Sequence, residues 1–219
     1  MASAGAGPST VVPPPVGRFQ LDTLKAQTWY RVHDYDPVTK RYEPQAFNNS
    51  GLGNARFSPL RDHTGNVIPT IYAASTPSGS IAEIVLHDVP TPSTGYILPW
   101  STIKTGKLHI SDIAAPDLNL VDLTSMGLRS AGLHPHDLFA GEKPDYPRTR
   151  DWALYIWVNI PAAQGLVWMS VRDNTSKVIM LFEDRLPAMA VQWAGMLEPI
   201  VVVENEVDRL LRKLGAGRA

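Results

Sequence analysis

The spacing of hydrophobic and polar positions changes often along the chain, which predicts many short elements. Residues 28–33, TWYRVH, alternate and predict a strand that carries Trp29, Arg31 and His33 on one face. Apolar stretches predict further strands at residues 67–74, 107–110, 165–171 and 177–182, with a short one at residues 56–57.

Start signals place one helix after the strand that ends at residue 74. Thr76 followed by Pro77 predicts an N-cap and a first turn. Residues 81–86 then supply a broad apolar face. At about 100° per residue, Glu83 and His87 project from the opposite side of this helix.

Other helices are predicted from their apolar spacing. Thr149 is expected to cap a largely buried helix that Pro161 ends. Further helices are expected at residues 21–26, 122–131 and 204–214, whereas residues 189–203 are apolar and ambiguous. Because strands and helices do not alternate strictly, the pattern favours an α+β fold over a doubly wound sheet.

The chain divides into three parts. Residues 1–20 form an arm rich in Pro, Gly and Ala, a composition that predicts flexibility. Residues 21–188 are expected to form one domain. Residues 189–219 are expected to add a strand and a helix that pack on the same domain.

Composition narrows the classes of function. The chain has 219 residues with 20 Lys and Arg against 21 Asp and Glu, so a broad nucleic-acid-binding surface is not expected. It has no cysteine, which excludes a disulfide and is compatible with the cytoplasmic location that we expect. No apolar run approaches the roughly 20 residues of a membrane helix, and the first residues do not form a signal peptide pattern.

The chemically informative positions are polar residues in apolar or Gly-rich surroundings: Arg31, Arg56, Tyr72, Glu83 and Ser170. Guanidinium groups suit phosphates, a phenol suits stacking on a flat ring, and a carboxylate suits a ribose hydroxyl. These residue types together predict a site for an anionic nucleotide. Neither a phosphate loop nor a nucleophile elbow accompanies them.

The two arginines also have structural explanations. Arg31 on a half-buried strand needs a partner, which could be Asp22, Asp34 or Asp36 in an ion pair. Arg56 follows Gly-Leu-Gly but lacks the third glycine of a dinucleotide fingerprint, and it could be a surface residue beside a turn.

The other three candidates have alternatives of their own. Residues 80–83 fit the capping box S-x-x-E, in which Glu83 would bond to the backbone at a helix start. Tyr72 could serve packing, and the Ser170 hydroxyl could be satisfied by a neighbouring backbone group. The HPHD segment at residues 134–137 is a weak metal signal without a second cluster, so we expect no metal.

The order and spacing of these motifs resemble the RES domain family, over about residues 23–185. The motifs are R-V-H at 31–33, G-x-G-x-x-R-F at 51–57, I-Y-A-A-S at 71–75, S-I-A-E at 80–83 and W-M-S-V-R at 168–172. Members of that family are typically toxins of bacterial RES–Xre toxin–antitoxin pairs. The resemblance implies a single α+β domain with a mixed, split β-sheet core flanked by short helices, similar to ADP-ribosyltransferase toxins.

The same resemblance implies an enzyme that consumes NAD as its substrate and uses no cofactor. The implied activity is NAD glycohydrolase or phosphorylase, with a mono-ADP-ribosyltransferase or a non-catalytic binding module as alternatives. Glu83 and Arg31 would be catalytic, while Arg56, Tyr72 and Ser170 would hold the nucleotide. The implied partner is an Xre-type helix-turn-helix antitoxin, with no direct contact to nucleic acid or membrane; a homodimer and a hetero-oligomer both stay open.

Overall fold

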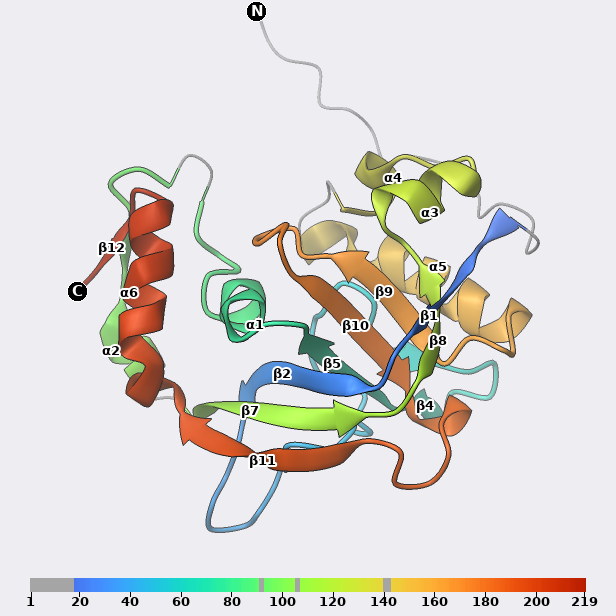
Figure 1. The fold of residues 1–219 in the computed structure, drawn as a ribbon, viewed down its shortest axis with the longest axis horizontal. Coiled ribbons are helices and arrows are strands. Elements are labelled where there is room, and N and C mark those ends of the chain that lie inside the picture. The colour runs from blue at the N-terminus through green and yellow to red at the C-terminus, as the bar shows by residue number, and fades with distance from the viewer. Residues whose placement is uncertain (1–17, 91–92, 105–106, 140–142) are drawn as a thin grey trace, which may run out of the picture.

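The structure is a computed structural model that describes residues 18–90, 93–104, 107–139 and 143–219. Most of the predicted arm therefore lies outside the described residues. Within the described ranges, the main sheet has eight strands in the order β1-β8-β9-β10-β5-β2-β7-β11 (Figure 1). Its strands are β1 (Leu21–Leu24), β2 (Gln27–Asp34), β5 (Thr70–Ala74), β7 (Leu108–Ala115), β8 (Leu118–Asp122), β9 (Gly165–Met169), β10 (Lys177–Phe182) and β11 (Gln192–Pro199).

This sheet consists of two halves that meet at one point. In the described part of the chain, β2 and β5 share a single register position, Tyr30 opposite Ala74, whereas β2 pairs with β7 at every residue from Gln27 to Asp34. Figure 1 shows β2, β7 and β11 crossing the lower part of the molecule, with β9 and β10 steeply inclined to them. β8 and β9 are parallel, and the other neighbours are antiparallel. The predicted α+β fold with a mixed, split sheet is thus confirmed.

Two small sheets and short helices complete the domain. β3 (Leu60–Arg61) pairs with β4 (Val67–Ile68), and β6 (Ile97–Leu98) pairs with β12 (Gly217–Arg218). The α-helices are α1 (Pro77–Ile84), α2 (Trp100–Lys104), α3 (Ser125–Ser130), α4 (Pro135–Phe139), α5 (Tyr146–Asn159) and α6 (Glu204–Lys213). Among the described residues, no helix has the length and apolar character needed to cross a membrane.

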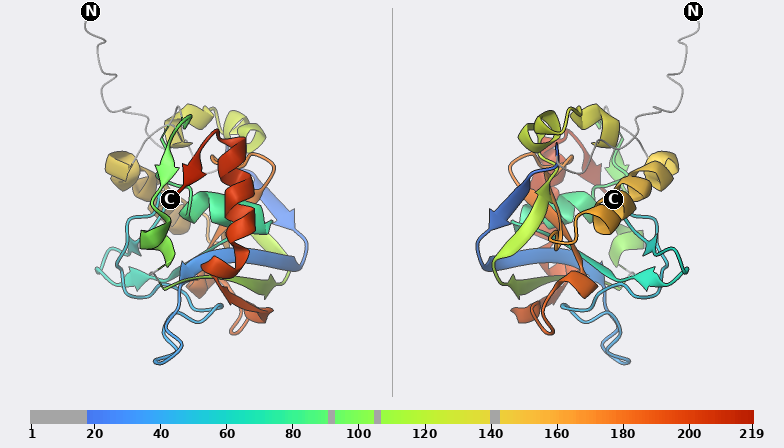
Figure 2. Two further views of the ribbon diagram at one scale, coloured as in Figure 1. Left: turned by 90° about the vertical axis from the view of Figure 1, so that its left-hand side faces the viewer. Right: turned by 90° about the vertical axis from the view of Figure 1, so that its right-hand side faces the viewer.

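The helices cover the two halves of the sheet separately. The apolar residues of α3, α4 and α5 pack on β9 and β10 in one core, which includes Trp152, Trp168 and Met180. Helices α1 and α6 share another core with β2 and β7. Figure 2 shows α6 on the outside of the molecule with α1 behind it. The helix that carries Glu83 is therefore enclosed between the sheet and α6.

The C-terminal elements join this architecture directly. β11 pairs with β7 at the edge of the main sheet, and Val207, Leu210 and Leu211 of α6 enter the core around α1. The ambiguous residues 189–203 form β11 and a 3-10 turn. The division of the chain at residue 188 stays a prediction.

Local signals predicted some elements correctly and failed where a distant partner decides. The strands at 28–33, 165–171 and 177–182 are confirmed as β2, β9 and β10. The helix expected at 21–26 is wrong, because Leu21–Leu24 forms β1 by pairing with β8, and tertiary pairing overrides weak local propensity. The strand expected at residues 56–57 is also wrong; this segment is a turn closed by an isolated bridge between Ala55 and Ser58.

The predicted cap of the longest helix is wrong as well. Helix α5 begins at Tyr146, three residues before Thr149. The Thr149 hydroxyl donates 3.0 Å to the Tyr146 carbonyl and also donates to the carbonyl of Arg56. A side chain that resembles a cap in the sequence thus ties the helix to the loop that carries Arg56.

Candidate active site

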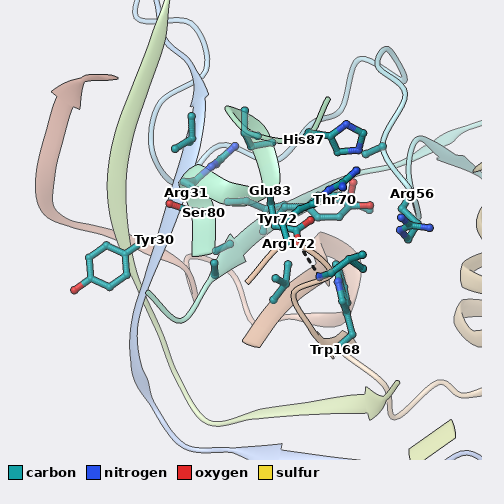
Figure 3. A pocket seen from close by; sticks show the side chains of 18 of the residues that line it. Tyr30, Arg31, Arg56, Thr70, Tyr72, Ser80, Glu83, His87, Trp168 and Arg172 are labelled. Atoms are coloured by element: carbon teal, nitrogen blue, oxygen red, sulfur yellow. Dashed lines mark hydrogen bonds between the residues drawn. The ribbon is translucent and has the colours of Figure 1, made fainter. Parts of the chain in front are cut away.

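A cavity of about 450 Å³ opens where the two halves of the sheet diverge. Figure 3 shows side chains from β2, β5, α1 and the adjoining loops around it. Four of the five predicted residues line this cavity: Arg31, Arg56, Tyr72 and Glu83. Its volume lies within the range of small-molecule sites.

Glu83 reaches the cavity because α1 begins early. The Thr76 hydroxyl caps the helix by accepting a hydrogen bond of 3.0 Å from the Gly79 N–H. The capping-box interpretation of residues 80–83 is therefore wrong, and Glu83 lies in the second turn of α1. Its Oε1 atom accepts hydrogen bonds from the Ser170 hydroxyl at 2.5 Å and the Val171 N–H at 3.1 Å. For Oε2, no hydrogen-bond donor is found in the described part of the chain.

Ser170 stands behind Glu83 and does not line the cavity. Its side chain is 2% exposed, and its oxygen accepts the backbone N–H groups of Arg172 at 3.2 Å and Asp173 at 2.9 Å. With its lone pairs used in this way, the hydroxyl proton is directed at the Glu83 carboxylate. Ser170 is thus placed to orient Glu83, and the expected backbone contact exists beside that function.

Arg31 projects from the middle of β2 into the cavity. Its Nη1 atom donates to the carbonyls of Pro44 at 2.7 Å and Ala46 at 3.1 Å. Burial lowers the pKa of this guanidinium to about 10. The buried Nε atom has no hydrogen-bond partner among the described residues, so Arg31 still has an N–H group that can donate a hydrogen bond to a ligand.

The ion pair considered for Arg31 does not form within the part of the chain that the structure describes. Asp22 pairs with Lys177 and Asp36 pairs with Lys107, and no described carboxylate, Asp34 included, forms a salt bridge with Arg31. Carbonyl groups hold this cation without neutralising it. A buried positive charge of this kind attracts an anionic ligand.

Arg56 is fixed by a different set of contacts. It donates 3.1 Å to the Leu138 carbonyl, and its guanidinium lies over the rings of Tyr146 at 4.9 Å and Phe139 at 5.6 Å. Burial lowers the pKa of Arg56, while Tyr146 and Glu83 act in the opposite direction. Arg56 is therefore not a loose surface arginine beside a turn.

Tyr72 forms part of the cavity wall. Its hydroxyl accepts the Phe57 N–H at 3.1 Å, and its ring meets that of Trp168 edge to face at 6.1 Å between centroids. Burial raises the pKa of the Tyr72 phenol, so it stays a neutral hydroxyl at physiological pH. The residue combines packing with a polar edge toward the cavity.

Three further cavity residues were not singled out from the sequence. His87 Nδ1 lies 2.7 Å from Asp88 Oδ1, and His87 Nε2 lies 2.9 Å from the Tyr146 hydroxyl. The helical period placed His87 beside Glu83 but gave no reason to expect a ligand there. Tyr146 comes from the start of α5, and only the fold brings it to His87.

Residues 134–137, which gave the weak metal signal, lie at the start of α4. The Asp137 carboxylate accepts the His134 N–H at 2.8 Å at the start of α4. Within the described ranges, no group of three or more His, Asp and Glu side chains is placed to hold a metal ion.

The cavity as a whole combines a fixed carboxylate with the cationic side chains of Arg31, Arg56 and Arg172. Arg31 and Arg56 are suited to the oxygens of a phosphate or pyrophosphate group. Glu83, with one oxygen held from behind and the other available, is suited to a ribose hydroxyl and to positive charge developing on a sugar.

Comparisons with known proteins concern the family and the fold of the chain. None of the curated proteins searched matches the chain. Among solved structures, a chain of the crystal structure of the M. tuberculosis MbcT–MbcA toxin–antitoxin complex is similar, with a TM-score of 0.57 and 17% identity, covering 87% of this chain and 93% of that chain. At this identity the likeness concerns the fold alone. The RES domain model matches residues 28–199, which is most of the chain, and the protein therefore belongs to the RES domain family.

Proposed function

We propose that this protein cleaves the N-glycosidic bond between nicotinamide and ribose in NAD, as a glycohydrolase or phosphorylase. The observation that carries the proposal is the Glu83 carboxylate, held by Ser170 and Val171 at a cavity that Arg31 and Arg56 also line. Nicotinamide in NAD is already cationic, so its departure builds positive charge on the ribose. A preorganised carboxylate stabilises such charge.

The other residues receive roles that fit their contacts. Arg31 and Arg56 hold the pyrophosphate or the ribose, and Tyr72 packs against the nicotinamide end. Ser170 acts by keeping the Glu83 carboxylate in one orientation. NAD is the substrate, and the proposed reaction uses no separate cofactor.

The test is nicotinamide release from NAD by the purified protein, followed by chromatography. We expect Glu83→Gln to lower turnover by about 10²–10³-fold, since it removes one electrostatic contact in the transition state. Glu198→Gln, an exposed position on β11, is the matched control and should leave turnover unchanged. Full activity in the Glu83 variant, or no release by the unaltered protein with or without phosphate, would overturn the proposal.

We also propose that the protein is the toxin of a toxin–antitoxin pair, acting on the NAD of the cytoplasm and neutralised by an Xre-type antitoxin. Support comes from membership of the RES family and from the fold shared with a chain of the MbcT–MbcA complex. Induced expression should lower cellular NAD and stop growth, and Glu83→Gln should do neither. Normal growth and normal NAD during expression of the unaltered protein would contradict this role.

A further inference from the structure

The turn that follows α1 brings a second chemical group into the cavity, four residues after Glu83. His87 is hydrogen-bonded on both sides, to Asp88 Oδ1 at 2.7 Å and to the Tyr146 hydroxyl at 2.9 Å. All three residues line the cavity. The Tyr146 side chain is buried, whereas Asp88 is 71% exposed, so the three side chains lead from the cavity toward solvent.

The partners of His87 define the direction of these hydrogen bonds. An ionised Asp88 only accepts, so Nδ1 of a neutral His87 carries the proton and donates it to Asp88. Nε2 is then an acceptor, and the Tyr146 hydroxyl donates to it. The lone pairs of the Tyr146 oxygen remain to accept a hydrogen bond from a molecule in the cavity. This is the order of groups that a proton relay requires.

Charged groups around the relay support its use as a base. The Arg56 guanidinium lies over the Tyr146 ring at 4.9 Å, where it stabilises negative charge that develops on the phenol oxygen as its proton leaves. Asp88 stabilises the imidazolium that forms when His87 accepts that proton. Glu83 and Arg172 are the other charged residues of α1 and the facing loop that line the cavity.

Glu83 itself is committed to a different task. One of its oxygens receives the Ser170 and Val171 hydrogen bonds, and in the proposed reaction the other meets the ribose. In Figure 3 Glu83 and His87 are separate side chains; Glu83 lies on α1, and His87 lies in the turn after the end of that helix. The site therefore divides charge stabilisation and proton removal between a side chain of α1 and a side chain of the turn that follows it.

We propose that Tyr146 and His87 relay a proton from the acceptor of the ADP-ribosyl group, and that this acceptor is water. The inference rests on the proposed cleavage of NAD and deepens it. The bond from ribose C1′ to the nicotinamide nitrogen breaks, and its electron pair stays on nicotinamide. The water oxygen bonds to C1′, the water proton passes to the Tyr146 oxygen, and the Tyr146 proton passes to His87 Nε2. His87 then releases a proton to solvent, so the products are nicotinamide, ADP-ribose and one proton.

The relay distinguishes water from inorganic phosphate as the acceptor. Phosphate is already an anion at neutral pH and attacks without losing a proton to a base. A base held in place by two hydrogen bonds accelerates the reaction of a neutral acceptor.

The test compares water with azide, an anionic nucleophile that needs no base. His87→Gln and Tyr146→Phe should each lower ADP-ribose formation by about 10²–10⁴-fold, the usual contribution of general base catalysis. Added sodium azide should restore nicotinamide release in both variants, with ADP-ribosyl azide as the product. Glu83→Gln should not be restored by azide. His63→Gln and Tyr42→Phe, both at exposed positions, are the matched controls.

The outcomes separate this inference from the proposed function. If the unaltered protein releases no nicotinamide with water, phosphate or azide, NAD cleavage itself is wrong. If it does release nicotinamide, an unchanged rate in His87→Gln and Tyr146→Phe overturns the relay. The relay is also overturned if azide fails to restore the lost activity in variants that unfold at the same midpoint as the unaltered protein. Where the His87 variant fails to fold, the conservative Tyr146→Phe decides alone. Faster formation of ADP-ribose 1-phosphate than of ADP-ribose in phosphate buffer overturns water as the acceptor.

Discussion

The Ser170 hydroxyl donates a 2.5 Å hydrogen bond to the Glu83 carboxylate across 87 residues of sequence. Ser170 follows β9, and Glu83 lies on α1, so this contact joins two elements that fold from distant parts of the chain. The orientation of the carboxylate therefore depends on how α1 sits against the β9–β10 loop.

Removal of this hydrogen bond should affect catalysis more than substrate binding. A hydrogen bond to a charged group contributes about 1.5–3 kcal/mol, and each 1.4 kcal/mol corresponds to about tenfold in rate. We therefore expect Ser170→Ala to lower kcat about 10- to 100-fold with little change in KM for NAD. Ser125→Ala, an exposed serine at the start of α3, is the control. A change in KM alone would mean that Ser170 contacts the substrate instead.

Gly79 allows α1 to pack closely against the same loop. A Cβ atom at residue 79 would lie 2.1 Å from the Ser176 hydroxyl and 2.5 Å from its Cβ. Overpacking of this kind costs about 1–3 kcal/mol. We expect Gly79→Ala to lower the free energy of unfolding by that amount, although alanine favours helices, and also to lower NAD turnover. Urea unfolding checks the first effect, and an unchanged or increased stability would contradict the close packing.

Gly79 also illustrates what the sequence could and could not predict. Thr76 and Pro77 are local signals, and they placed the start of α1 correctly, whereas a glycine inside a helix is unfavourable by local propensity. Its reason is a contact with Ser176, almost a hundred residues away. Local patterns likewise predicted β2, β9 and β10, but β1 exists because β8 offers a partner.

The candidate site divides in the same way. Arg31, Arg56, Tyr72 and Glu83 were found because their motifs stand in a family order, and the structure brings them to one cavity. His87 had the signal of a shared helical side with Glu83, which is typical of any solvated helix. Tyr146 had no sequence signal, because its place opposite His87 depends on where α5 begins.

Arg31 should be sensitive even to a conservative change. Its Nη1 atom bonds two carbonyls, of Pro44 and Ala46, which connects β2 to the following loop. A lysine has no planar fork and cannot hold these carbonyls while also presenting a donor to an anion. We expect Arg31→Lys to raise KM for NAD about tenfold, the effect of losing one charged hydrogen bond. Steady-state kinetics checks this, with Arg129→Lys on the exposed side of α3 as the control. An unchanged KM in the Arg31→Lys variant would exclude Arg31 from NAD binding.

His33 should make the fold sensitive to acid. Its ring is buried, with Nε2 at 2.8 Å from the Ser111 hydroxyl and Nδ1 at 2.8 Å from the Asp34 carbonyl. Burial, helped by the charge of Arg31, lowers the pKa of His33 from 6.5 to about 3. Below about pH 6.5 the imidazole of His33 binds a proton in the unfolded chain but not in the folded chain. The free energy of unfolding therefore falls as the pH decreases from 6.5 toward 3.

The size of this acid effect can be isolated with one substitution. Between pH 7 and pH 4.5, His33 should account for about 2 kcal/mol of lost unfolding free energy, since the unfolded imidazole is almost fully protonated at pH 4.5. His33→Gln should lower stability at pH 7, where the Ser111 contact is disturbed, but should reduce the difference between the two pH values by about that amount. Urea unfolding at both pH values measures it, with the exposed His63→Gln as the control. An equal pH difference in the His33 variant and the unaltered protein would mean that other groups govern the acid response, since the proton uptake assigned to His33 would then be missing.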